Sequence, residues 1–184
     1  MRRLILLTAA ALACAAAAPA PKAPPAKAPA AKAAPKAPAA KAAAYDAQNP
    51  QSLTTLLGEL GAKTTPARKE EDSVFVTVTS AAANFSLQFA GCDAQGRACK
   101  AALYDSLMGG GAPTLGQING FNQTSVFCRV YQDKTGKPHA IYAAMLVKSD
   151  NRDSAMTHLA AWQGCLGEAR DFLRDPVAYL ANAA

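Results

Sequence analysis

Apolar and polar residues alternate along several stretches in the middle of the chain. Valine occupies every second position within 73–79, and Phe85, Leu87 and Phe89 do the same within 84–90. A period of two is typical of half-buried β-strands. Further strands are expected at 62–68, where Pro66 interrupts an edge strand, at 99–108, at 126–132 and at 139–147. The last two flank a turn-forming segment, Asp133 to Pro138, which predicts a hairpin.

Three other stretches have the helical period. Asn49 and Pro50 predict the start of a first helix, with an N-cap residue followed by proline. Thr114 caps a short second helix, and Asn151 or Asp153 opens the longest one, which stops at Asp175-Pro176. The apolar faces are expected to consist of Leu53, Leu56, Leu57 and Leu60 in the first helix, of Leu115, Ile118 and Phe121 in the second, and of Met156, Leu159, Trp162, Leu166, Ala169 and Leu173 in the third. The order helix, three or four strands, helix, two strands, helix predicts an α+β fold with a mainly antiparallel sheet.

The N-terminus has the pattern of an export signal. Arg2 and Arg3 precede an apolar run over 4–13, which is shorter than the roughly 20 residues needed to span a bilayer. Residues 1–14 are therefore expected to be a signal peptide. Ala11-Leu12-Ala13-Cys14 resembles a relaxed lipobox, which would make Cys14 a lipid-modified N-terminus and anchor the protein to a membrane. Cleavage near residue 17, after an alanine run, is the alternative.

Residues 15–44 consist only of 18 alanines, seven prolines and five lysines. Such a segment cannot form a core, so it is expected to be a disordered tether before a single domain at 45–184. Seven of the 19 basic residues precede Tyr45, whereas all 13 acidic residues follow it. The domain thus carries a formal charge of about −1, and no nucleic-acid partner is expected.

Four cysteines follow the tether, at Cys92, Cys99, Cys128 and Cys165. An even number in an exported chain predicts two disulfides. The first two cysteines flank a polar, glycine-containing turn, which favours a bridge between them and leaves Cys128 to pair with Cys165. Cys128 is expected to point inward with Val126 and Val130 on a strand, and Cys165 shares a helical face with other apolar residues. The spacing does not fit a zinc site, so no metal or other cofactor is expected.

The segment from Thr114 to Asn122 is similar to the T-L-x-x-I-N-x-W-N string of the YbjN family, with Phe121 in place of the tryptophan. A strand, a hairpin turn and a tryptophan-bearing final helix follow it, as in that family. The resemblance covers most of the domain and implies a fold like that of type III secretion chaperones. It implies a loosely sensory or regulatory role and no defined activity.

Motifs for a reaction are absent from the sequence. A set of Ser125, His139 and Asp133 can be imagined, but their spacing does not select them, and His158 is the other histidine. The aromatic residues Phe121, Tyr131, Tyr142 and Trp162 either line a groove for a partner or form core.

The leading hypothesis is a non-enzymatic, exported binding or chaperone-like protein of the bacterial cell envelope, located in the periplasm. It would hold a protein or peptide partner on its sheet–helix surface, and a homodimer is left open. A structural envelope lipoprotein and an enzyme with a dispersed site are the alternatives. Binding predicts an exposed apolar patch beside the second helix or an open sheet edge. An enzyme predicts a pocket at His139 or His158.

Overall fold

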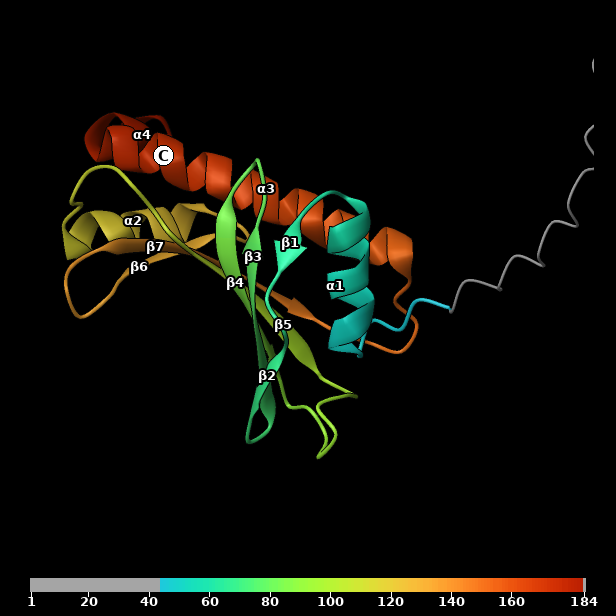
Figure 1. Cartoon of the computed structure of the whole chain (residues 1–184). Helices are drawn as coiled ribbons and strands as arrows, with labels where there is room; N and C mark the ends of the chain where they lie inside the picture. Colours follow the sequence, from blue (N-terminus) through green and yellow to red (C-terminus); the bar gives the residue numbers. More distant parts are fainter. Residues whose placement is uncertain (1–43, 184) are drawn as a thin grey trace, which may run out of the picture. The chain divides into compact units, whose positions relative to one another are not determined.

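The computed structural model describes residues 44–183, which form one sheet and four helices (Figure 1). Every strand pair is antiparallel, and the order across the sheet is β1-β3-β4-β5-β7-β6, with β2 also paired to β3. The strands are β1 (Lys63–Thr64), β2 (Arg68–Glu70), β3 (Ser73–Thr79), β4 (Asn84–Ala90), β5 (Ala101–Leu107), β6 (Arg129–Gln132) and β7 (Pro138–Met145). The helices are α1 (Pro50–Glu59), α2 (Leu115–Thr124), α3 (Arg152–Arg174) and α4 (Pro176–Asn182). The expected α+β class with a mainly antiparallel sheet is confirmed.

The core lies between one face of the sheet and the helices. The alternating residues of β3 to β5 and β7 are buried on this face, where they join the leucines of α1 and the apolar stripe of α3. Figure 1 shows α3 crossing the strands along its length. The opposite face carries no helix from the described residues, as antiparallel sheets commonly allow.

Some elements differ from the expected ones. The stretch 62–68 yields two very short strands on either side of Pro66, because proline cannot donate to the ladder. Strand β6 begins at Arg129, and Val126 is 87% exposed, so Val126 does not face inward with Cys128. The longest helix, α3, ends at Arg174 as predicted, but Pro176 begins a further short helix, α4, since proline fits the first turn and the Asp175 side chain accepts a hydrogen bond from the Ala178 amide.

Three residues expected on buried helical faces are exposed. Leu60 is 52% exposed at the C-cap of α1, Leu115 is 69% exposed at the start of α2, and Met156 is 40% exposed in α3. Leu60 follows the last residue of α1 and Leu115 is the first residue of α2, so neither continues the buried stripe of its helix. Leu60 and Met156 line the same cleft, which is described below.

Two disulfides join the expected cysteines. The short bridge, Cys92–Cys99, closes the connection between β4 and β5, and the long bridge, Cys128–Cys165, ties the chain before β6 to α3. Within the described residues, no helix has the length and apolar character required to cross a membrane. The expected signal peptide, Cys14 and almost all of the tether lie outside these residues.

Candidate functional site

An apolar cleft of about 400 Å³ lies between α1, α3 and the β3–β4 turn. Leu60 and Met156 line it from the two helices, Phe85 and Trp162 form its aromatic wall, and the alanines at 81–83 line it from the turn. No charged side chain of the described part of the chain lines it. Its volume is in the range of sites for small ligands or for part of a larger partner.

Trp162 is fixed in this wall by its aromatic neighbours. Its ring centroid lies 5.6 Å from that of Phe85, in an edge-on arrangement, and 5.8 Å from that of Tyr104. The side chain is only 2% exposed, and its indole Nε1 has no hydrogen-bond partner among residues 44–183. Buried indole N–H groups usually have an acceptor, so the unpaired Nε1 of Trp162 is an exception among the described residues.

Helix α2 closes one edge of the sheet. The Asn122 side chain accepts a hydrogen bond from the Val130 amide at 2.9 Å and donates one to the Val130 carbonyl at 3.0 Å. These are the backbone groups that an edge strand would offer to an added strand. The edge of β6 is therefore occupied at Val130, and the open edge that the binding hypothesis predicts is not found there.

The residues from Thr114 to Asn122, which resemble the YbjN string, form the helix that covers this sheet edge. Thr114 and Gln117 form a capping box at the start of α2. Ile118 and Phe121 are buried beneath the helix, and this packing holds Asn122 over β6.

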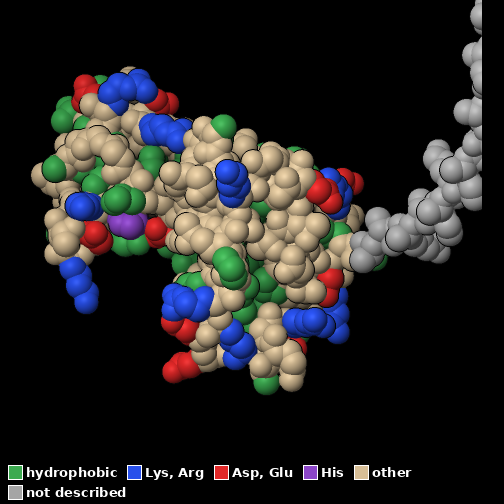
Figure 2. Space-filling model, viewed as in Figure 1, with side chains coloured by type: hydrophobic (Ala, Val, Ile, Leu, Met, Phe, Trp, Pro, Cys, Tyr) green, Lys and Arg blue, Asp and Glu red, His purple; other side chains and the backbone are tan. Residues whose placement is uncertain are grey.

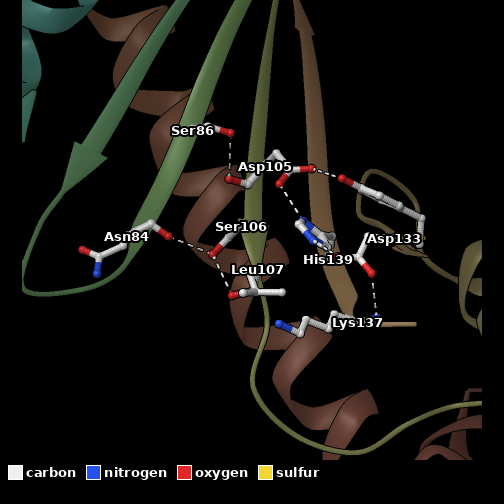
Figure 3. Close-up of polar contacts among 9 residues, drawn as sticks. Asn84, Ser86, Asp105, Ser106, Leu107, Asp133, Lys137 and His139 are labelled. Carbon is white, nitrogen blue, oxygen red and sulfur yellow. Dashed lines mark hydrogen bonds and ion pairs between the residues drawn. The ribbon is translucent and has the colours of Figure 1, made fainter. Parts of the chain in front are cut away.

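A second cluster, of polar residues, lies on the helix-free face over β5, β6 and β7 (Figure 3). Asp105 accepts a hydrogen bond from the Tyr131 hydroxyl at 2.6 Å, and its other carboxylate oxygen lies 2.8 Å from Nδ1 of His139. The Tyr131 and His139 rings are stacked, with centroids 4.9 Å apart. Nε2 of His139 lies 3.8 Å from Asp133.

The electrostatics of this cluster favour its present protonation states. Desolvation and the hydrogen bond to Asp105 raise the pKa of Tyr131 far above its usual value. Hydrogen bonds from the Thr135 side chain and the Lys137 amide hold the pKa of Asp133 at about 2. The tyrosine thus stays protonated and Asp133 stays ionised at neutral pH. Both nitrogens of His139 face carboxylates, which suits a polar link between strands better than a free general base.

The imagined catalytic set does not assemble. Asp133 lies near His139, but the Ser125 hydroxyl donates to Glu168 of α3 at 2.8 Å and accepts from the Cys128 amide. His158 forms a 2.7 Å hydrogen bond with the Tyr142 hydroxyl. The cleft is lined by neither histidine, and no group of three or more metal-ligating side chains is found within the part of the chain described.

The four aromatic residues do not line one groove. Phe121 is fully buried and packs against Phe172, with ring centroids 4.8 Å apart, and Tyr142 is 8% exposed. Trp162 lines the cleft, whereas Tyr131 is 38% exposed on the helix-free face. The core interpretation therefore holds for Phe121, Tyr142 and Trp162, all of which belong to the hydrophobic core. Leu60 and Met156 were predicted as core residues and not as site residues, and their apolar character near helix ends was the available signal.

Figure 2 shows acidic and basic side chains interspersed over the face in view, which agrees with the near-neutral charge of the domain. No family model matches the chain, and neither a curated protein nor a solved structure matches it. The functional proposal consequently depends on the geometry described above.

Proposed function

We propose that the protein is a non-enzymatic, chaperone-like binding protein of the bacterial cell envelope that holds an apolar part of a protein or peptide partner. The observation that carries the proposal is the uncharged cleft between α1 and α3, with the exposed side chains of Leu60 and Met156 at its walls. Concave sites with apolar walls are the usual binding sites of soluble domains. The cleft lies on the sheet–helix side of the fold, away from the edge that Asn122 closes.

The two bridges support a location outside the cytoplasm. Disulfides persist in oxidising compartments, and the domain contains two of them. Together with the arginines and apolar run at the N-terminus, they support export to the periplasm, with Cys14 as the lipid anchor and residues 15–44 as the tether. We extend the proposal to membership of the YbjN family, supported by the α2 string and the α+β class.

The enzyme alternative has one observation in its favour. Asp105 binds Nδ1 of His139, an arrangement that orients an imidazole for proton transfer. Asp133 occupies the direction of Nε2, however, and the cluster lies on the face opposite the core, with the cleft elsewhere. We therefore favour binding over catalysis.

Photo-cross-linking in intact cells tests the binding proposal. A photoreactive amino acid replaces Met156, which lines the cleft, or Met145, which is 71% exposed on the other face and serves as the matched control. We expect a discrete protein adduct at position 156 only, and we expect it to be lost in Leu60→Lys but retained in Leu115→Lys. Equal adducts at both methionine positions, or none at 156, would refute the proposal.

The location is tested independently by mass spectrometry of the mature N-terminus. We expect either lipid-modified Cys14 or a terminus near residue 17. Recovery of the intact chain with Met1 in the cytoplasmic fraction would contradict export.

A further inference from the structure

Helix α4 is held to the rest of the domain by few side chains. It has seven residues, and none of them is buried. Isolated helices of this length are not stable in water, so α4 depends on what it packs against. After its initial proline, only Tyr179 and Leu180 of α4 are half-buried, whereas Val177 is 70% exposed. Two adjacent side chains therefore account for most of the attachment.

These two side chains lie on a surface of α2 and α3, which we call the α4-binding surface. Its members are Gly120, Phe121, Glu168 and Phe172. The ring centroid of Tyr179 lies 5.6 Å from that of Phe121 and 5.7 Å from that of Phe172. Its hydroxyl donates a hydrogen bond to Oε1 of Glu168 at 2.8 Å. Leu180 lies over Gly120, where a Cβ would come within 3.1 Å of Cδ2 of the leucine.

Contacts that do not involve α4 also hold the α4-binding surface in place. The rings of Phe121 and Phe172 pack against each other, and both are fully buried although α4 itself is not. The second carboxylate oxygen of Glu168 accepts a hydrogen bond from the Ser125 hydroxyl at 2.8 Å. Detachment of α4 would therefore expose a preformed aromatic surface beside one carboxylate oxygen that lacks its donor.

The C-terminal end of α3 is likewise held without α4. The carbonyl of Leu173 accepts a hydrogen bond from the Gly111 amide at 3.2 Å, which gives one of the last carbonyls of α3 a partner outside the helix. Asp175 alone separates α3 from α4. Opening of a weakly held terminal element requires much less free energy than global unfolding. Helix α4 can therefore detach as a unit while α2 and α3 stay folded.

The exposed surface specifies what can replace α4. The two phenylalanine rings favour an aromatic ring, Oε1 of Glu168 accepts from a hydroxyl, and the space at Gly120 takes a branched aliphatic side chain. A helix that carries tyrosine followed by leucine meets all three requirements, and α4 of a second copy carries this pair. Exchange between two copies reproduces every contact made within one chain, and short connections such as Asp175 favour it.

We propose that α4 is a detachable terminal helix and that the α4-binding surface of one chain takes the α4 of a second copy. The interaction is non-covalent and reciprocal, so each chain of the pair supplies one helix and one surface. It does not involve the cleft between α1 and α3, and the proposal is therefore independent of the proposed function.

Hydrogen exchange in the full-length, oxidised protein tests the detachment. The amides of Tyr179 and Ala183 donate within α4. After correction for intrinsic rates, we expect them to exchange at least about a hundredfold faster than the amides of Phe172 and Leu173 in α3. Equal rates in the two helices would show that they open together and would overturn the proposal.

Photo-cross-linking between isotope-labelled copies tests the exchange. A photoreactive leucine analogue replaces Leu180 in the full-length protein, and equal amounts of unlabelled and ¹⁵N-labelled chains are mixed at increasing concentration and irradiated. Mass spectrometry then identifies adducts that join α4 of one isotope to α2 of the other. We expect the share of mixed adducts to rise with concentration toward about half, the value for random pairing. Absence of mixed adducts at every concentration would overturn the proposal, whether or not the protein forms a dimer.

Two glycine variants of α2 locate the contact. Gly120→Ala crowds Leu180 and should lower the yield of α2–α4 adducts about fivefold or more. Gly116→Ala is the matched control on the same helix, because its Cβ would meet the nearest atom at 3.9 Å, and it should leave the yield unchanged. Equal yields in the two variants would show that α4 does not bind at Gly120 and would overturn the proposal.

Discussion

The closure of the sheet edge by Asn122 makes a quantitative prediction for Asn122→Ala. The substitution removes the two hydrogen bonds to Val130, and each is worth about 1 kcal/mol net. Val130 is only 1% exposed, so its freed backbone groups are poorly placed to bind water. We therefore expect the free energy of unfolding to fall by about 2 kcal/mol, rising toward about 4 kcal/mol if both groups stay dry.

Asn119→Ala is the matched control, because Asn119 lies on the same helix and is exposed. Both substitutions replace asparagine by alanine on one helix and gain the same helix propensity. The difference between their changes in the free energy of unfolding therefore isolates the contacts of Asn122 with the sheet edge. Urea unfolding of the oxidised protein, followed by the fluorescence of its single tryptophan, measures both. A difference below about 0.5 kcal/mol would show that Asn122 does not hold the edge.

The other predictions concern the bridges, the glycine loop and a tyrosine. Replacing both cysteines of the long bridge by alanine should lower the free energy of unfolding by about 4 kcal/mol, because the bridge closes a long loop. The same replacement at the short bridge should lower it by about 2.5 kcal/mol. A larger loss for the short bridge in urea unfolding would contradict this chain-entropy reasoning. Gly111→Ala should destabilise the fold, because a Cβ there would lie 2.8 Å from the Leu173 carbonyl oxygen. Gly109→Ala is the control, because its Cβ would meet no atom within 4 Å. Equal unfolding midpoints for the two variants would refute the close approach. Burial and the hydrogen bond to Glu168 raise the pKa of Tyr179 to about 12, so its contribution to stability is complete below pH 10 and is lost as the pH rises toward 12. Tyr179→Phe should flatten this loss, and an unchanged pH profile would show that the tyrosine does not cause it.

Local patterns were sufficient to predict most elements of the fold. The period-two stretches over 73–79 and 84–90 coincide with β3 and β4, because each strand has one face on the core. Thr114 and Asn151 cap their helices as predicted, since capping depends on the next few residues only. The cysteine pairing also followed from local context and elimination.

The features that were missed depend on tertiary neighbours. Periodicity places Leu60 and Met156 on apolar faces, but it cannot tell that no side chain covers them where the two helices and the β3–β4 turn diverge. The role of Asn122 depends on Val130 across the sheet edge, which no local pattern reveals. The pair of Asp105 and His139 lies 34 positions apart in sequence and meets through the register of β5 and β7.

The most direct test of the account follows the single indole N–H signal of Trp162 in the ¹H–¹⁵N spectrum of the oxidised protein. During titration with an N-acetylated peptide of alternating leucine and serine residues, a cleft that binds an apolar group of a partner should shift this signal saturably. The shift should be lost in Met156→Lys and retained in Met145→Lys. An indole signal that stays in place throughout the titration would contradict the proposal that this cleft is the binding site.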